Sequence, residues 1–498
     1  MAKRIARWLA LASVIVPAHV LAARAPETRA APASVVVADR ALPLRHFHWS
    51  RATGTDAEGY YHQPAGLSDD FPEGTTAQKI ERDLTTAAET GAEVFRFGMA
   101  WDHIEKEPGR YDFHLWDQVI DAAVRHGVTP IPYLCYTPEW AATGAKDPWS
   151  QPPRDPSAFA RFAAVVAERY RGVVHAWELW NEPDNEAYWR GTPDDFARMV
   201  TGAARQIRRV DPEAVVVLGG MAKGRGPFVD ALVGRLGVDR TFDVVNVHGY
   251  LETWSRESAE GYPARVDAMA ALLPPPGRGP DLWLAELGYS DHRVAPGEPG
   301  TYTHEVYAYE HTPEYQATSL IKDHVLALAP EKVSLTVWYR VDDLPATEEV
   351  IGDAHNRHLG VLDLGGNRKP SFYALRLYNR LFDRPARTLD ARVQVTRPPG
   401  SQSEAHVFEK KDGGVLLFAW LRSPRQAEGT APQAAVDDRR ESISVALPGA
   451  GYGTMTVYDE RGEVIPSTAR LAGSVVEGVR LTGDRVFIAE LGRRAEAR

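Results

Sequence analysis

The sequence predicts an α/β protein: a (β/α)8 TIM barrel over residues 40–383, followed by a C-terminal antiparallel β-sandwich over residues 384–498. Two observations lead to this fold class. Up to about residue 383, short apolar runs alternate with segments whose apolar residues recur every three to four positions. Beyond that point the helical pattern stops, and strand-like runs are separated by turns rich in Gly, Pro and Asp. Eight strand–helix units over roughly 340 residues favour a closed barrel over an open sheet.

The barrel elements follow in order along the chain. Leu115, Trp116, Val119 and Ile120 illustrate the helical spacing, and Gly127 ends that helix. The expected strands are 44–49, 94–99, 128–133, 175–180, 214–218, 242–247, 282–287 and 333–339. The expected helices are 76–90, 112–127, 157–170, 193–210, 228–236, 262–273, 313–329 and 371–381.

The C-terminal segment contains six short strand-like runs and no long helical pattern, which is typical of a β-sandwich. Residues 33–39 are a candidate additional strand of this sandwich. Trp420 is its only tryptophan and falls in an apolar run, so we expect a structural cap on the barrel in preference to a sugar-binding module. The six runs are 393–396, 404–408, 415–421, 442–447, 454–458 and 486–491.

The first 25 residues have the pattern of a secretory signal peptide. Lys3, Arg4 and Arg7 precede an apolar run over 8–22, and Ala23-Arg24-Ala25 is a plausible cleavage site. The alternative is an N-terminal membrane anchor, for which the run is short. We therefore expect a secreted or periplasmic protein with no integral membrane segment after cleavage.

Charge and cysteine content restrict the possible partners and the means of stabilisation. The formal net charge is −10, and it becomes −14 once the four basic residues of the first 25 are removed. Such a surface repels nucleic acid, so a neutral polymer or small molecule is the expected partner. Cys135 is the only cysteine, which allows no internal disulfide, and we expect it to lie in the core.

Two carboxylates occupy the positions where a barrel carries its chemistry. Glu182 follows the fourth predicted strand in Trp180-Asn181-Glu182-Pro183, and Glu286 ends the seventh. The carboxyl ends of barrel strands meet at one face, so side chains three strands apart can face each other across it. A facing pair of carboxyl groups is what acid-catalysed cleavage of a glycosidic bond requires.

The run 177–183 resembles the acid/base motif of clan A glycoside hydrolases, and 284–288 resembles their nucleophile strand. The resemblance covers the whole barrel and implies substrate-binding or supporting roles for further residues. It implies that Asn181 binds the sugar 2-hydroxyl and that Arg96 holds Glu286 ionised. From the residues alone, Arg96 has an alternative partner in Glu178. The resemblance also implies that His248 and Tyr250 approach the two carboxylates.

Aromatic residues at strand ends complete the expected site, because sugars stack their C–H faces on aromatic rings. By the same resemblance Trp338 forms the floor under the sugar. Trp140, Tyr136 and Trp101 are further expected contacts. The segments 104–113 and 136–140 and the trailing sandwich are most similar to family 39. That family includes β-xylosidases, α-iduronidases and exopolysaccharide hydrolases.

The resemblance implies a retaining glycoside hydrolase that cleaves O-glycosidic bonds of an oligo- or polysaccharide by double displacement. Glu182 would be the acid/base and Glu286 the nucleophile, with no cofactor. The alternative hypothesis is a non-catalytic carbohydrate-binding barrel that acts in polysaccharide assembly or export. No metal site is expected, since His355 and His358 lack the spacing and the Glu of a zinc-protease motif.

Overall fold

The computed structural model describes residues 49–62, 65–235, 237, 241–255, 257–275, 277–292, 311–423, 437–449 and 451–493. The predicted signal peptide, the candidate strand 33–39 and most of the expected strand 44–49 lie outside these residues. Within the described ranges, no helix combines the length and the apolar character needed to cross a membrane.

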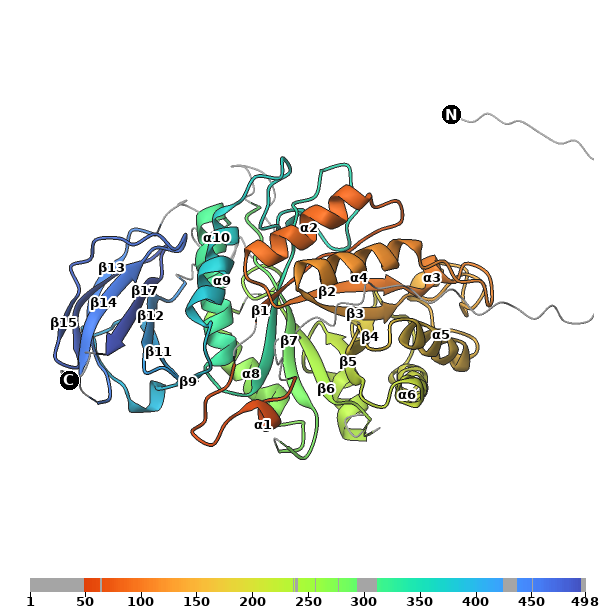
Figure 1. The fold of residues 1–498 in the computed structure, drawn as a ribbon, viewed down its shortest axis with the longest axis horizontal. Coiled ribbons are helices and arrows are strands. Elements are labelled where there is room, and N and C mark those ends of the chain that lie inside the picture. Colours follow the sequence, from red (N-terminus) through yellow and green to blue (C-terminus); the bar gives the residue numbers. More distant parts are fainter. Residues whose placement is uncertain are drawn as a thin grey trace, which may run out of the picture. The chain divides into compact units, whose positions relative to one another are not determined.

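Eight parallel strands form a closed barrel in sequence order, with β1 paired to β8, so the predicted barrel is confirmed. Helices surround the strands (Figure 1). The strands are β1 Ala65–Ser68, β2 Val94–Ala100, β3 Thr129–Cys135, β4 Ala176–Asn181, β5 Val215–Met221, β6 Val244–Gly249, β7 Asp281–Leu287 and β8 Val333–Tyr339. The helices that follow them are α2 Ala77–Glu89, α4 His114–His126, α5 Pro156–Arg169, α6 Pro193–Val210, α7 Pro227–Asp230, α8 Tyr262–Ala270, α9 Pro313–Leu328 and α10 Pro370–Leu381.

The barrel strands are buried on both faces, which explains why they read as continuous apolar runs in the sequence. Helix α6 illustrates how a covering helix is fixed. Thr192 and Asp195 form a capping box at its start, worth about 1 kcal/mol. Phe196, Met199 and Ile207 lie on its buried face, and burying such side chains stabilises the fold by about 1.5–3 kcal/mol each.

The first barrel strand differs from the prediction. It is Ala65–Ser68, whereas residue 49 of the expected strand lies in a bend, and its Trp49 ring stacks on Trp283 at 5.7 Å. This strand has only four residues and is buried throughout, so it offers no alternating pattern to detect. A Cβ at Gly66 would lie 2.3 Å from the Val94 side chain, which shows how closely β1 approaches β2.

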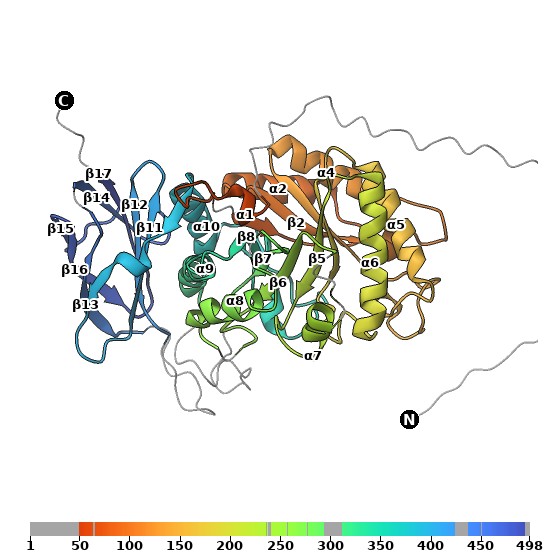
Figure 2. The same ribbon diagram turned by 90° about the horizontal axis from the view of Figure 1, so that it is seen from below.

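The C-terminal residues form two antiparallel sheets, as predicted, with strand orders β10-β13-β16-β15 and β14-β17-β12-β11-β9. Figure 2 shows these strands, and a short 3₁₀ turn, Asp390–Arg392, connects β9 to β10. Strand β12 buries Leu417 in the sandwich core, and its opposite face packs Phe418 against Phe382, which follows α10. Trp420 is also buried. The strands are β9 Ala386–Thr388, β10 Gln394–Thr396, β11 Ser403–Lys410, β12 Val415–Leu421, β13 Arg440–Ala446, β14 Tyr452–Tyr458, β15 Arg470–Ala472, β16 Val475–Thr482 and β17 Phe487–Arg493.

Candidate active site

A cavity of about 340 Å³ opens at the carboxyl ends of the barrel strands. Both carboxylates singled out in the sequence, Glu182 and Glu286, line it. Its wall is rich in tyrosine and in polar groups that can hydrogen-bond. Other lining residues are Asp70, Tyr133, Tyr136, Asn181, Asn185, Tyr188, Lys223, Tyr250, Trp254, Arg265, Tyr339 and Asn356.

Glu286, on β7, is held through both of its carboxylate oxygens. Arg96 Nη1 donates to Oε2 at 2.6 Å, and the Tyr250 hydroxyl donates to Oε1 at 2.5 Å. Burial and the negative charge of Glu286 raise the pKa of Tyr250, so the phenol keeps the proton that it donates. These contacts hold both oxygens of the Glu286 carboxylate in place.

Glu182 lies one residue beyond β4 with a positive φ of 45°, and its N–H donates to the Gly220 carbonyl at 2.9 Å. Its Oε1 lies 3.0 Å from His248 Nδ1, and its Oε2 accepts from Asn185 Nδ2 at 3.0 Å. The tight backbone path after β4 therefore turns the carboxyl group toward the centre of the cavity.

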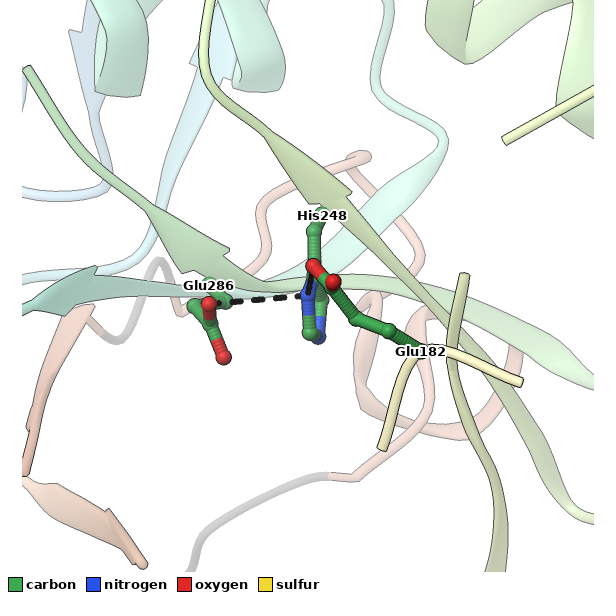
Figure 3. A group of neighbouring side chains, drawn as sticks. All are labelled: Glu182, His248 and Glu286. Carbon is green, nitrogen blue, oxygen red and sulfur yellow. Dashed lines mark hydrogen bonds and ion pairs between the residues drawn. The ribbon is translucent and has the colours of Figure 1, made fainter. Parts of the chain in front are cut away.

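His248 stands between the two carboxylates (Figure 3). Its Nδ1 is 3.0 Å from Glu182 Oε1 and 3.6 Å from Glu286 Oε1, and one ligand atom from each of the three residues lies within 4.8 Å of the others. Burial lowers the pKa of the imidazole, but Glu286 and the hydrogen bond with Glu182 outweigh it, so the pKa is raised. A Cβ at Gly220 would lie 1.9 Å from Nε2, so the ring requires glycine at that position on β5.

Arg96 makes both of the contacts that the sequence left as alternatives. Besides Glu286, it donates from Nε and Nη2 to Glu178 at 2.7 and 2.9 Å, and from Nη2 to Asn181 Oδ1 at 2.9 Å. Burial raises the pKa of Glu178, but Arg96 outweighs it and the net pKa is lowered. Asn246 Nδ2 completes the shell with a 3.0 Å bond to Glu178. One guanidinium thus connects β2, β4 and β7 beneath the cavity.

Of the other residues expected to contact a sugar, Asn181 and Tyr136 line the cavity, and three tryptophans do not. Trp338 and Trp101 are fully buried, and the N–H of Trp140 donates to the Glu105 carbonyl. Expecting Trp338 in the floor was wrong, because side chains alternate along β8. Its ring turns outward to stack on His324 at 6.1 Å, and the next residue, Tyr339, lines the cavity instead.

Several cavity residues were not predicted from the sequence, among them Asp70, Tyr133, Asn185 and Tyr188. Asp70 lies two residues beyond the true first strand, so a correct assignment of β1 would have placed it close to a strand end. The other three lie on β3 or in loops after strands, where polarity alone does not separate a lining residue from a solvent-facing one.

A metal ion could in principle be bound by one atom from each of Glu182, His248 and Glu286. However, the two oxygens of Glu286 already accept bonds from Arg96 and Tyr250, and a guanidinium in that position opposes a second cation. These residues are therefore better suited to proton transfer and to nucleophilic attack on carbon than to binding a metal ion.

A closed parallel barrel with facing carboxylates at the ends of its fourth and seventh strands is the arrangement of a clan A glycoside hydrolase. The family model described as Cellulase (glycosyl hydrolase family 5) matches residues 55–290, within the barrel. The resemblance to clan A expected from the sequence is confirmed by this match, and the closed barrel is the fold that the resemblance implies.

Several curated relatives match parts of the chain, among them the following two. Phospho-cellobiase of Klebsiella oxytoca is 28% identical over 166 residues, which cover 27% of this chain and 36% of that protein. Thermostable beta-glucosidase B of Thermobispora bispora is 27% identical over 242 residues, which cover 44% and 50%. The chain thus spans half or less of these relatives. A solved family 39 glycoside hydrolase of Bacteroides cellulosilyticus WH2 has the same fold, with a TM-score of 0.61, 17% identity, and coverage of 87% of this chain and 81% of that chain.

Proposed function

We propose that this protein is a retaining glycoside hydrolase that cleaves O-glycosidic bonds of an oligo- or polysaccharide by double displacement. The observation that carries the proposal is the spacing of Glu182 and Glu286, whose nearest oxygens lie within 4.8 Å of each other. Retaining enzymes hold their two carboxyl groups about 5–5.5 Å apart, whereas inverting enzymes need about 6.5–9.5 Å to admit a water.

The surroundings of the two carboxyl groups support different roles for them. Glu286 forms an ion pair with the Arg96 guanidinium, and a carboxylate held in this way is suited to act as the nucleophile. Glu182 contacts His248 and the Asn185 amide, and Arg96 forms no bond with it. In the first step Glu182 gives its proton to the leaving oxygen while Glu286 bonds to the anomeric carbon. In the second step Glu182 takes a proton from water, which displaces Glu286 and restores both groups.

The substrate class follows from the relatives by analogy. Curated relatives include a beta-glucosidase and a beta-xylosidase, and we extend their substrate class, gluco- or xylo-oligosaccharides, to this chain as part of the proposal. We further propose that residues 1–25 direct export to a secreted or periplasmic location. The barrel over 40–383 would then act outside the cytoplasm with the sandwich over 384–498 as its cap.

The test is the release of nitrophenol from 4-nitrophenyl β-D-glucoside, β-D-xyloside and a wider panel of aryl glycosides. Glu286→Ala should abolish turnover, and Glu182→Ala should lower kcat/KM by about 10²–10⁴-fold. Glu168→Ala, an exposed glutamate on α5, is the matched control and should leave kcat/KM unchanged. Activity of Glu286→Ala at the wild-type level would refute the assignment.

Stereochemistry is tested separately. Proton NMR of the first product should show the anomer of the substrate, and the opposite anomer would rule out retention. The alternative, a non-catalytic carbohydrate-binding barrel, predicts oligosaccharide binding with no release from any glycoside of the panel.

A further inference from the structure

A third carboxylate, Asp70, lies in the cavity and has no part in the two catalytic steps. It lies two residues beyond β1 and lines the cavity wall. The Tyr133 hydroxyl donates to its Oδ1 at 2.5 Å, and the Tyr339 hydroxyl donates to its Oδ2 at 3.2 Å. Burial raises the pKa of this carboxyl group, so placing it here costs stability. A group kept at such a cost calls for a functional reason.

Asp70 is not the partner of a structural ion pair. The Arg340 guanidinium donates to the neighbouring carboxylate, Asp69 Oδ1, at 2.5 Å. In the described part of the chain, no lysine, arginine or histidine forms an ion pair with Asp70. A carboxylate has about four acceptor positions, and the two tyrosines fill one on each oxygen. Each oxygen therefore retains a free position, and both belong to a residue that lines the cavity.

The strand order shows which part of a substrate Asp70 would meet. β7, β8 and β1 are neighbours in the barrel, so Asp70 and Tyr339 continue the wall from Glu286 and away from Glu182 on β4. In the proposed mechanism Glu286 bonds to the anomeric carbon and Glu182 protonates the leaving group. The sugar that Glu286 attacks therefore lies on the side of the cavity away from Glu182. Tyr133, which donates to Asp70, is held in place relative to Glu286, because the Arg96 guanidinium lies over its ring at 4.4 Å and also binds Glu286.

We propose that Asp70 is a specificity-determining residue that accepts hydrogen bonds from hydroxyl groups on the far side of the sugar bonded to Glu286. The ligand class is a neutral sugar with adjacent free hydroxyl groups at that end. A sugar that carries a carboxylate there is rejected, because it would place a like charge against Asp70. This inference rests on the proposed hydrolase function, and it adds which sugars the glycon position takes.

The test compares Asp70→Asn with wild type on the aryl glycoside that the wild type hydrolyses, on its 4-deoxy analogue, and on 4-nitrophenyl β-D-glucuronide. We expect the variant to lose about 10- to 100-fold in kcat/KM on the parent glycoside, in line with a hydrogen bond to a charged group. It should lose much less on the 4-deoxy analogue and should discriminate less against the glucuronide. Asp267→Asn, an exposed residue on α8, is the control and should match wild type.

An Asp70→Asn variant within twofold of wild type on all three substrates would overturn the inference and leave the hydrolase function standing. An equal loss on parent and deoxy substrates would also overturn it, since a merely structural role predicts that result. Failure of the wild type on every glycoside would refute the hydrolase function instead. In that case calorimetric titration of wild type and Asp70→Asn with D-glucose and D-xylose tests the contact between Asp70 and the sugar by itself. Weaker binding by Asp70→Asn would support this contact, and equal binding would overturn it.

Discussion

Replacing Arg96 with methionine tests whether the buried charge network beneath the cavity supports both the fold and the site. The guanidinium is fully buried and makes two bonds to Glu178, one to Glu286 and one to Asn181. Methionine fills much of the same volume but leaves Glu178 as a buried carboxylate without a cation. Asn246 and the Gly220 N–H remain as its donors.

The expected loss in the free energy of unfolding is the difference between two contributions. Hydrogen bonds to charged groups contribute about 1.5–3 kcal/mol each, and part of that gain is offset because the variant no longer buries a guanidinium. Breaking a buried pair by removing one partner costs about 3–5 kcal/mol, and we expect a loss in that range. The pH dependence has a definite sign. Arg96 lowers the pKa of Glu178, so the stabilisation is present above about pH 5 and declines as the carboxylate is protonated at lower pH.

Urea unfolding at pH 7 and pH 4 measures this effect. The m-value of a chain of this length exceeds the about 1–3 kcal/mol/M of small proteins, so the free energies of unfolding are compared directly. The free energy of unfolding of Arg96→Met should be lower than that of the wild type by about 3–5 kcal/mol at pH 7, and the difference should narrow in acid. Arg125→Met removes an exposed pair with Glu81 and Asp121 and should cost at most about 1 kcal/mol. A loss below about 1 kcal/mol for Arg96→Met, or one that is independent of pH, would show that the Arg96–Glu178 pair does not stabilise the fold.

Two further predictions concern histidine environments. Gly220→Ala places a Cβ 1.9 Å from His248 Nε2, so we expect it to displace the imidazole ring and to lower kcat/KM by at least about 10²-fold. The control is Gly202→Ala, whose Cβ would have its nearest contact at 3.7 Å and should leave kcat/KM unchanged. Near-normal activity of Gly220→Ala would contradict the fixed position of the ring. Burial lowers the pKa of His324 to about 4, so protonation favours the unfolded chain, and stability should fall by on the order of 3 kcal/mol as the pH drops from about 6.5 to 4. His324→Gln should reduce this acid sensitivity in urea unfolding measurements, and an unchanged pH profile would show that the imidazole titrates freely in the folded state.

Much of the fold could be predicted because its pattern is local. The helix predicted over 193–210 matches α6 in full, since its capping residues and its 3.6-residue period lie within one segment. The first strand could not be predicted in the same way. Its four residues have no period, and what defines them is pairing with β2 and β8, of which β8 lies more than 260 residues further along the chain.

The residues of the active site also differ in how far they could be predicted from the sequence. Glu182 and Glu286 were identified because a carboxylate at the end of an apolar strand is visible in sequence and barrel topology gathers strand ends at one face. The tryptophans were misjudged because the sequence does not specify which way a ring turns at the rim. At β8 the outward residue is Trp338 and the inward one is Tyr339, and a shift of one residue exchanges the two faces.

The barrel, the sandwich and the two strand-end carboxylates can be predicted from the chain alone, because each depends on a short-range pattern or on the order of such patterns. Three features become visible only in the folded molecule: Arg96 binds Glu178 and Glu286 together, His248 stands between the carboxylates, and Asp70 faces the cavity. These contacts join different strands at distances of a few ångströms, over which hydrogen bonds and charges act. Spacing along the chain carries no record of such distances.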